Sequence, residues 1–408
     1  MSIANLPCTP PEPNTVAPRA GSELMLRWLP ASSRAEALFL WRKLELGLSN
    51  PRNACSSLWT EVWLNHFGGI VPHQFAIAMR DGKACGITLL TEGVEQVAGP
   101  FKLNTRHIGT AGEPDADSVY VEYNSVLAAP EDRAEFVHAL WLWARQQTNC
   151  DEFRLDGFDA ASIEPFLARN PQSLVKRRPS YFFELDSVRE TGADPLTKLG
   201  SQTRGNIRRT LRDLGDARGE WAETANRAEE LFHQMVQLHQ ARWNAAGHPG
   251  VYSSARFHEF HLELLNRAVS LGLMGIFALT AGNRLIGCCQ FLIDHRRVLQ
   301  YQCGRAPSSG RVSYGMAIDY LCICESLRRG YEAVDFLAGE TEHKRRMSTH
   351  KAEMAWVVWR RTSLKNAAID AMRRIKRATS QLGRSDSSTT VCADTPPADA
   401  TAPAESKE

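Results

Sequence analysis

The sequence predicts a mixed α/β (α+β) fold made of two similar halves. Residues 75–90 and 276–291 each read as a β-hairpin, two apolar runs joined by a turn that contains glycine. Each hairpin follows an amphipathic helical stretch and precedes a strand, a helix and a second strand. This repeated order favours two domains, each a mixed, mostly antiparallel sheet flanked by helices. Two unrelated α/β domains with a similar order of elements are the alternative.

The repeated elements can be placed along the chain by their periodicity. In the first half they are expected as a helix, a strand, a helix and a strand at residues 55–67, 119–127, 131–147 and 152–158. In the second half the matching elements are expected at residues 254–271, 297–304, 315–329 and 333–337. A chain of 408 residues is long enough for both domains.

The composition excludes several classes of protein. The hydrophobic fraction of 43% is normal for a packed chain, and the net charge of +2 indicates neither a nucleic-acid nor a membrane partner. The ten cysteines form no C-x-x-C pair, so we expect no metal site, only reduced, mostly buried thiols in a cytoplasmic protein. The N-terminus lacks the pattern of a signal peptide, and no run of 18 apolar residues predicts a membrane span.

Composition also suggests where the domains begin and end. Both ends are rich in proline and small polar residues and read as disordered tails. The predicted division is a tail, a first domain, a second domain and a tail at residues 1–22, 23–190, 191–375 and 376–408. The stretch 363–382 is amphipathic and basic, and we expect it to pack on the second domain; weak contact with a membrane surface is the alternative.

The segment that joins the halves, residues 198–218, is rich in arginine. Arg204, Arg208 and Arg212 recur every four residues and therefore share one face of a helix. One interpretation is a clamp for an anionic substrate, with Arg204 and Arg208 as binding residues. A solvated basic face fits the same pattern.

A loop rich in serine and glycine, residues 306–315, precedes the second helix of the second half. Such a loop gives free backbone N–H groups at the positive end of a helix, where a pyrophosphate can bind without charged side chains. Glycine there lets the phosphate approach closely. The cofactor-binding candidates are Ser309, Gly310, Ser313, Tyr314 and Gly315.

Two motifs in the second half resemble the GNAT acyltransferase superfamily. The resemblance is to the tandem-GNAT branch that contains CelD-type acetyltransferases and the FemABX peptidoglycan aminoacyltransferases. That branch carries an S-P-G turn at a helix start and, about twenty residues later, D-F-x-x-G-[DE]-x-x-[YH]-K. Residues 313–315 correspond to the turn, with Tyr314 in place of proline, and residues 335–344 (DFLAGETEHK) correspond to the second motif, with His343 in place of the common tyrosine.

The segment 238–252 also resembles this branch, through its L-H-x-x-R-W-x-x-x-G pattern. It adds His239, Arg242 and Trp243 as substrate-binding candidates, although His239 and Trp243 lie four apart and equally fit a packed helix face. The resemblance covers residues 195–360 by motif and residues 30–185 only by architecture. It implies two tandem GNAT-like domains and an acyl-CoA, most simply acetyl-CoA, as co-substrate.

The resemblance also implies where the chemistry occurs. The strands 297–304 and 333–337 would admit the thioester, with Tyr301 facing the substrate and backbone amides polarising the carbonyl. Removing the acceptor's proton needs a base, for which Glu340 or Asp335 is the candidate, and Lys344 could hold an anionic acceptor. His343 completes the catalytic candidates. A solvated loop, with Lys344 paired to Glu340, is the structural alternative.

The equivalent helix of the first half begins differently. Pro130, Glu131 and Asp132 make a good helix start by themselves, and the two carboxylates would repel a pyrophosphate. The first half is therefore expected to have lost cofactor binding and to serve as a wall of the acceptor cleft or as a stabilising partner.

The resulting hypothesis is an acyl-CoA-dependent N- or O-acyltransferase. By analogy with the branch, the acceptor is a small molecule, an amino sugar or a polysaccharide precursor, as in exopolysaccharide synthesis. One alternative is an aminoacyltransferase that uses aminoacyl-tRNA, the one case in which a nucleic acid would be a partner. Another is a non-catalytic scaffold in cell-envelope synthesis. The sequence does not define the oligomeric state.

Overall fold

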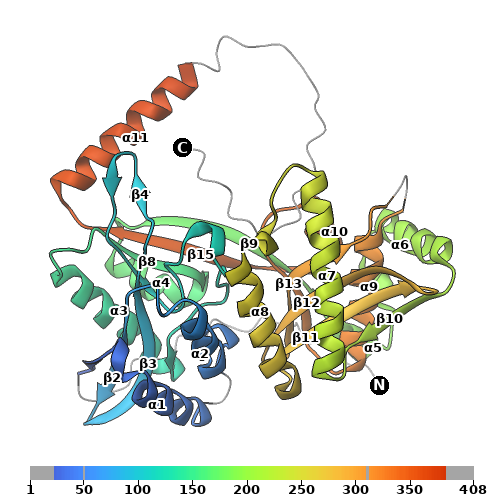
Figure 1. The fold of residues 1–408 in the computed structure, drawn as a ribbon, viewed down its shortest axis with the longest axis horizontal. Helices are drawn as coiled ribbons and strands as arrows, with labels where there is room; N and C mark the ends of the chain where they lie inside the picture. The colour runs from blue at the N-terminus through green and yellow to red at the C-terminus, as the bar shows by residue number, and fades with distance from the viewer. Residues whose placement is uncertain (1–22, 49–50, 309–311, 383–408) are drawn as a thin grey trace, which may run out of the picture.

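The computed structural model describes residues 23–48, 51–308 and 312–382, with side chains through residue 375. In this part of the chain thirteen strands form one sheet, in the order β1-β2-β3-β6-β8-β15-β9-β14-β13-β12-β11-β10, with β7 beside β3. Figure 1 shows the two halves side by side, the first in blue and green and the second in yellow and orange. The predicted α/β class is confirmed, and the two expected sheets are joined into one.

The first half contains the first predicted hairpin. Asp81 and Gly82 at its turn have φ angles of 51° and 72°, the left-handed pair that a type I′ hairpin requires. Its elements are β1 (Met25–Pro30), α1 (Arg34–Leu46), α2 (Ser57–His66), β2 (His73–Arg80), β3 (Lys83–Glu92), β4 (Val97–Ala98), β5 (Phe101–Lys102), β6 (Thr105–Ile108), β7 (Leu127–Ala128), α3 (Pro130–Gln146), β8 (Glu152–Asp159), α4 (Ala160–Arg169) and β9 (Leu174–Glu184).

The second half repeats the pattern with longer helices. Thr224 and Ser254 cap α7 and α8, each accepting a hydrogen bond from the amide three residues later. Its elements are α5 (Asp186–Thr191), α6 (Ser201–Leu214), β10 (Ala217–Trp221), α7 (Ala225–Ala245), α8 (Ala255–Ala268), β11 (Met274–Ala281), β12 (Arg284–Asp294), β13 (Arg297–Arg305), α9 (Tyr314–Arg328), β14 (Ala333–Ala338), α10 (Glu342–Met347), β15 (His350–Arg360) and α11 (Leu364–Leu382).

The two halves exchange strands at their junction. β9, from the first half of the sequence, pairs antiparallel with β14 of the second half. β15, near the end of the chain, lies between β8 and β9 and pairs antiparallel with both. Each half therefore contributes one strand to the sheet of the other.

Helices cover both faces of the second half. Ile276 on β11 packs in one hydrophobic cluster with Phe232 of α7 and Phe260 of α8. The next residue, Phe277, packs in another cluster with Ile318 of α9 and with α6. Because side chains alternate across a strand, α7 and α8 lie on one face and α6 and α9 on the other.

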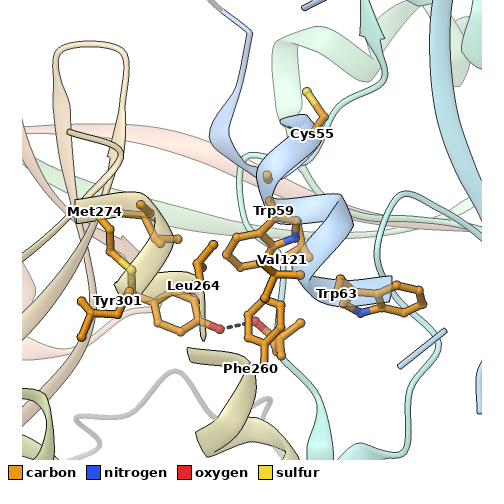
Figure 2. Packing of buried hydrophobic residues seen from close by; sticks show 14 of the residues in the cluster. Cys55, Trp59, Trp63, Val121, Phe260, Leu264, Met274 and Tyr301 are labelled. Carbon is orange, nitrogen blue, oxygen red and sulfur yellow. Dashed lines mark hydrogen bonds between the residues drawn. The ribbon is translucent and has the colours of Figure 1, made fainter. Parts of the chain in front are cut away.

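The halves also share a hydrophobic core. Trp59 of α2 packs edge-on against Phe260 of α8, with ring centroids 5.1 Å apart. Figure 2 shows these rings beside Leu264, Val121 and Tyr301, which come from both halves. Burying such large side chains stabilises the junction by roughly 1.5–3 kcal/mol each.

Most predicted elements agree with the structure, but the strand predicted at residues 119–127 is wrong. The place beside β3 and β8 is taken by β6, and only Leu127–Ala128 pairs, as β7. Tyr120 and Tyr123 have positive φ angles of 36° and 54°, which an extended strand cannot contain. The tail predicted at 1–22 lies outside the described residues, and so does the tail predicted at 376–408 from residue 383 on. Its first part was predicted wrongly, because residues 376–382 are the end of α11.

The predicted docking of the C-terminal helix is also wrong. Ile369 of α11 is buried against Ala98 and Leu103 of the first half, and Asn366 donates to the carbonyl oxygen of Asp151 at 3.1 Å. α11 thus packs on the first half, because it directly follows β15, which lies in the sheet of that half. No helix in the described ranges is long and apolar enough to cross a membrane.

Candidate active site

Strands β13 and β14 run parallel, then separate. Their pairing joins Arg297–Leu299 to Ala333–Asp335 and ends there. On its other edge β13 has a bulge, because Gln290 of β12 pairs with Gln302 while the next residue pairs with Gln300, so Tyr301 is the extra residue. We call the opening beyond this pairing the V. The bulge lies beside the V, and the main-chain N–H and C=O groups of its extra residue are not part of the regular hydrogen bonding between the strands.

Asp335 fixes the β14 side of the V. Its Oδ1 accepts hydrogen bonds from the hydroxyl of Ser180 and the amide of Leu337, both at 2.8 Å. Its Oδ2 accepts from the hydroxyl of Tyr123 at 2.6 Å and from the guanidinium of Arg297 at 2.7 Å. This fully buried carboxylate therefore accepts four hydrogen bonds, about as many as its two oxygens can accept. It joins β9, β13, β14 and the first half.

The segment 119–123 of the first half lies against the V. The hydroxyl of Tyr301 donates to the carbonyl oxygen of Val119, the contact drawn as a dashed line in Figure 2. The amide of Ala338, at the end of β14, donates to Oε2 of Glu122 at 2.8 Å. A pocket at this junction has a volume of about 10 Å³, room for one small group such as an amine or a hydroxyl. It is lined by residues of both halves, among them Tyr120, Glu122, Tyr123, Leu299, Tyr301 and Leu337.

Glu122 has the electrostatic character of a base. Burial raises its pKa to about 7, with the amide of Ala338 and the charge of Lys344 acting in the opposite direction. A carboxyl group that titrates near neutral pH can both accept and release a proton at working pH. Its side chain lines the pocket rather than being enclosed on every side like that of Asp335.

The N-terminus of α9 lies on the other side of β13 and β14. Ser313 occupies the cap position without a capping hydrogen bond from its side chain, and the first turn contains no acidic residue. The amide of Ser313 donates to the hydroxyl of Thr210 on α6 at 3.1 Å. Gly315 is buried. The end of the helix thus keeps its positive character, as predicted for an anion site.

Two arginines lie at this helix end. A Cβ at position 315 would collide with the guanidinium of Arg305, so the glycine lets Arg305 lie against the first turn. Arg284 lies 6.0 Å from the ring centre of Tyr314. Cations beside the positive end of a helix favour an anion between them. Ser309 and Gly310, the other cofactor-binding candidates, lie outside the described residues.

His343 lies on the α9 side as well. Its Nε2 is 2.6 Å from Oδ2 of Asp319, while Oδ1 of that buried carboxylate accepts from Gln300 of β13 at 3.0 Å. Its Cε1 would be 3.2 Å from a Cβ at position 315. The imidazole is therefore held beside the first turn of α9, next to Arg305.

The remaining charged residues of the DFLAGETEHK motif point elsewhere. Lys344 donates to the carbonyl oxygens of Leu337 and Ala338, at 3.2 and 2.9 Å, at the end of β14. Glu340 is exposed. Glu342 is also exposed and pairs with the arginines that follow it on α10. The structure therefore brings Lys344 close to Glu122 but does not gather the four catalytic candidates at one point.

Of the two arginines predicted to clamp a substrate, one makes a hydrogen bond within the protein. Arg204 is partly buried and donates to the carbonyl oxygen of Leu199 at 2.7 Å. Arg208, one turn later on α6, is exposed. Of the two, Arg208 has the side chain that is available to a ligand.

The candidates on α7 lie on the opposite face of the sheet from α9. Burial lowers the pKa of His239 to about 4, so its ring is neutral near pH 7, and it packs edge-on against Tyr252 at 5.1 Å. Trp243 has a buried indole nitrogen without a hydrogen-bond partner among the described residues, and Arg242 is partly exposed beside it. In the described chain, no group of three His, Cys, Asp or Glu residues could hold a metal ion.

The sequence of the second half matches a known family. Residues 201–345 match the family model described as "Acetyltransferase (GNAT) domain". Residues 201–345, called the GNAT domain below, are similar to that family. The match includes α6, both strands of the V, α9 and the whole DFLAGETEHK motif, so the resemblance seen in the sequence is confirmed for this part of the chain.

Solved structures extend the similarity to most of the chain. The structure titled "Crystal structure of FemX" aligns with a TM-score of 0.50 and 10% identity, over 81% of this chain and 96% of that one. The C-terminal domain of a putative lysylphosphatidylglycerol synthetase from Agrobacterium fabrum also gives 0.50 and 10%, over 83% and 96%. At such identity these likenesses show a shared fold. No curated protein has a matching sequence.

Outside the GNAT domain, the first half has a second pair of parallel strands, β6 and β8. Their pairing also ends after three residues, at His107 and Arg154. Here Asn124 fills the opening, because its amide group donates to the carbonyl oxygens of Ile108 and Asp156 at 2.9 and 3.1 Å. The equivalent space is thus closed by the chain itself, which supports the expected loss of cofactor binding in the first half.

Sequence reasoning missed three residues around the GNAT site. Glu122 lies in the segment that was expected to be a plain strand, Asp319 in the middle of an apolar helix, and Arg305 just before the serine-rich loop. The lone acid in the apolar stretch 314–323 was the available signal for Asp319, since a buried charge needs a partner. The position of Glu122 depends on contacts more than 200 residues away and left no local signal.

Proposed function

We propose that this chain transfers an acyl group, with acetyl as the simplest case, from acyl-CoA to an amine or hydroxyl of a small acceptor. The acceptor class is an amino sugar or a polysaccharide precursor, as the sequence resemblance suggests. In this proposal residues 201–345 bind the donor, while residues 23–190 supply one wall of the acceptor pocket. The free cysteines among the described residues fit a reducing cytoplasm.

One observation carries the proposal. The pocket where β13 and β14 separate is lined by Glu122, whose pKa burial raises to about 7, and the open end of α9 lies beside the same two strands. A site that binds an anion next to a site that can take up a proton is what acyl transfer from a phosphate-bearing carrier requires.

The donor would occupy the V and the end of α9. The diphosphate fits the first turn near Gly315, where main-chain amides and Arg305 can neutralise its charge. Bound there, acyl-CoA supplies an activated carbonyl carbon. The bulge at Tyr301 leaves main-chain donors beside the V, which can stabilise negative charge on the carbonyl oxygen.

Glu122 would act on the acceptor. An amine or hydroxyl in the pocket attacks the carbonyl carbon, Glu122 takes its proton, the new C–N or C–O bond forms and the C–S bond breaks. The leaving thiolate then takes up a proton. Lys344, held at the end of β14, balances negative charge near Glu122. In this proposal Asp335 positions Tyr123 and β14 rather than contacting the acceptor.

Replacing Gly315 by valine should lower the affinity for acetyl-CoA about ten- to a hundredfold, because the new side chain displaces Arg305 and covers the amides of the first turn. The protein should stay folded, since the collision is with the far end of a flexible side chain. Calorimetry measures the affinity. Gly69→Val is the matched control, as a Cβ there meets nothing within 4 Å. If the affinity for acetyl-CoA were unchanged in Gly315→Val, the donor would not bind at the start of α9.

Calorimetry should also give one acetyl-CoA per chain. The start of α9 and Arg305 give the GNAT domain a place for the diphosphate, whereas Asn124 closes the space between β6 and β8 in the first half. A stoichiometry of two would contradict the assignment of the first half as a wall.

The acceptor and the donor can be identified together. The protein is incubated with a panel of amino sugars and either acetyl-CoA or aminoacyl-tRNA, and mass spectrometry detects the product. A product that gains one acetyl group from acetyl-CoA supports the proposal. Transfer from aminoacyl-tRNA alone, or folded protein that binds no acyl-CoA, would refute it.

A further inference from the structure

A second pocket lies in the first half, away from the V. Its volume is about 350 Å³, within the range of small-molecule sites. It is formed where the C-terminal ends of α3 and α4 meet the end of β15. The lining contains two tryptophans, four arginines and three neutral polar residues, and no acidic side chain: Trp141, Arg145, Arg169, Asn170, Gln172, Trp359, Arg360, Arg361 and Thr362.

The arginines of this pocket are not all neutralised by the fold. Arg360 pairs with Glu152 and Asp370, at 2.9 and 2.7 Å. Arg361 donates to main-chain carbonyl oxygens at the end of α3 and has no carboxylate partner in the described chain. Arg145 and Arg169 are exposed, and the described residues offer neither of them an ion pair. The pocket therefore has an excess of positive charge that suits an anion.

Buried polar atoms in the lining also lack partners. Among the described residues, Oδ1 of Asn170 and Nε1 of Trp141 have no hydrogen-bond partner, although Asn170 is fully buried and Trp141 is only 6% exposed. Such atoms normally find a partner in a folded protein, so their presence in a pocket wall points to an absent ligand or solvent.

The aromatic rings give the pocket a rigid wall. Trp141 and Trp359 meet edge to face, with centroids 5.9 Å apart, and the guanidinium of Arg145 lies 5.4 Å from the ring centre of Trp141. Each tryptophan is only 6% exposed, so a ligand would contact a small apolar part of the rings, while the exposed Gln172 and Thr362 can bond hydroxyl groups of a sugar. Arginine is the side chain best matched to a phosphate.

We propose that this pocket is a binding site for a phosphorylated small molecule of sugar size. The phosphate is held by Arg145 and Arg169, and the neutral part contacts the tryptophans and bonds Gln172 and Thr362.

The site is separate from the transferase centre. β15 connects them, because His350 pairs with Phe182 beside Asp335, while Trp359 lies at the pocket. Nine residues of strand span about 30 Å, which is too far for one small ligand to occupy both places. The proposed ligand is therefore not the acceptor of the transfer.

Calorimetry of the full-length protein with glucose 6-phosphate tests the proposal, with glucose and inorganic phosphate as comparison ligands. Glucose 6-phosphate should bind more tightly than either. The double variant Arg145→Ala, Arg169→Ala should weaken binding at least about tenfold, since it removes two charge-assisted contacts from exposed positions that no ion pair of the described chain uses. Lys83→Ala, which removes an exposed charge from the β2–β3 turn, should change nothing.

The Gly315→Val variant separates this site from the donor site, because it should bind glucose 6-phosphate normally. Loss of binding in that variant would place the phosphate at α9 and overturn the proposal. Equal binding of inorganic phosphate, or binding that the double variant leaves unchanged, would overturn it as well.

Discussion

Replacing Glu122 by glutamine is expected to lower kcat about 10²- to 10⁴-fold, the usual contribution of a general base. The amide keeps the size of the side chain but cannot take a proton from the acceptor. The affinity for acetyl-CoA should stay the same, because Glu122 lies on the acceptor side of the V. Steady-state kinetics together with calorimetry of acetyl-CoA checks both expectations.

The pH profile gives an independent test of the same residue. A base must be unprotonated, so wild-type kcat should rise with pH up to about 7, the pKa to which burial raises Glu122, and level off above it. In Glu122→Gln this rise should disappear. Glu340→Gln is the matched comparison, since Glu340 is exposed in the DFLAGETEHK motif and was the base first suggested by the sequence. If Glu340→Gln lost the rise and Glu122→Gln kept it, the base would be Glu340.

Replacing Asp335 by alanine is expected to lower the free energy of unfolding by about 3–5 kcal/mol, because it leaves the guanidinium of Arg297 without its buried partner. The hydroxyls of Tyr123 and Ser180 and the amide of Leu337 lose their acceptor as well. Urea denaturation followed by circular dichroism measures the change.

A milder variant isolates the role of this network. Tyr123→Phe removes one of the four hydrogen bonds to Asp335 and should cost about 1 kcal/mol. A direct catalytic role for Asp335 would give a different result, an alanine variant with normal stability and no turnover.

The hairpins and the long helices could be predicted because their signals are local. Asp81-Gly82 specifies a tight turn, and the helices have capping residues and apolar faces that repeat every three to four residues. The helix end at Ser313 to Gly315 was predicted for the same reason. Local chemistry was enough to predict where α9 begins.

The proposed acceptor side could not be predicted, because distant contacts determine its conformation. Apolar and polar residues alternate over 119–127, a pattern that predicts a strand. The segment is irregular instead, because Tyr123 is hydrogen-bonded to Asp335 and Glu122 to the amide of Ala338. Those partners are 212 and 216 residues away. Left-handed tyrosines are unfavourable unless surrounding contacts enforce them, so the sequence pattern and the native conformation differ here.

The DFLAGETEHK motif shows the same limit on a smaller scale. Its neighbours in sequence suggested one cluster, but the strand end, the sharp turn at Gly339 and the start of α10 send successive side chains in different directions. Asp335 points into the core, His343 towards α9 and Lys344 to the end of β14. Proximity along a chain that leaves a strand is weak evidence for proximity in space.

The crossing of β9 and β15 determines when the molecule can become complete during synthesis. The sheet of the N-terminal portion stays open beside β8 until residues 350–360 leave the ribosome, because that strand follows all the other strands of the second half in the chain. Until then, β8 and β9 each present a row of unsatisfied main-chain groups that can recruit another nascent chain. Neither portion can therefore mature alone, and a gene cut between them would yield two aggregation-prone fragments instead of two working proteins.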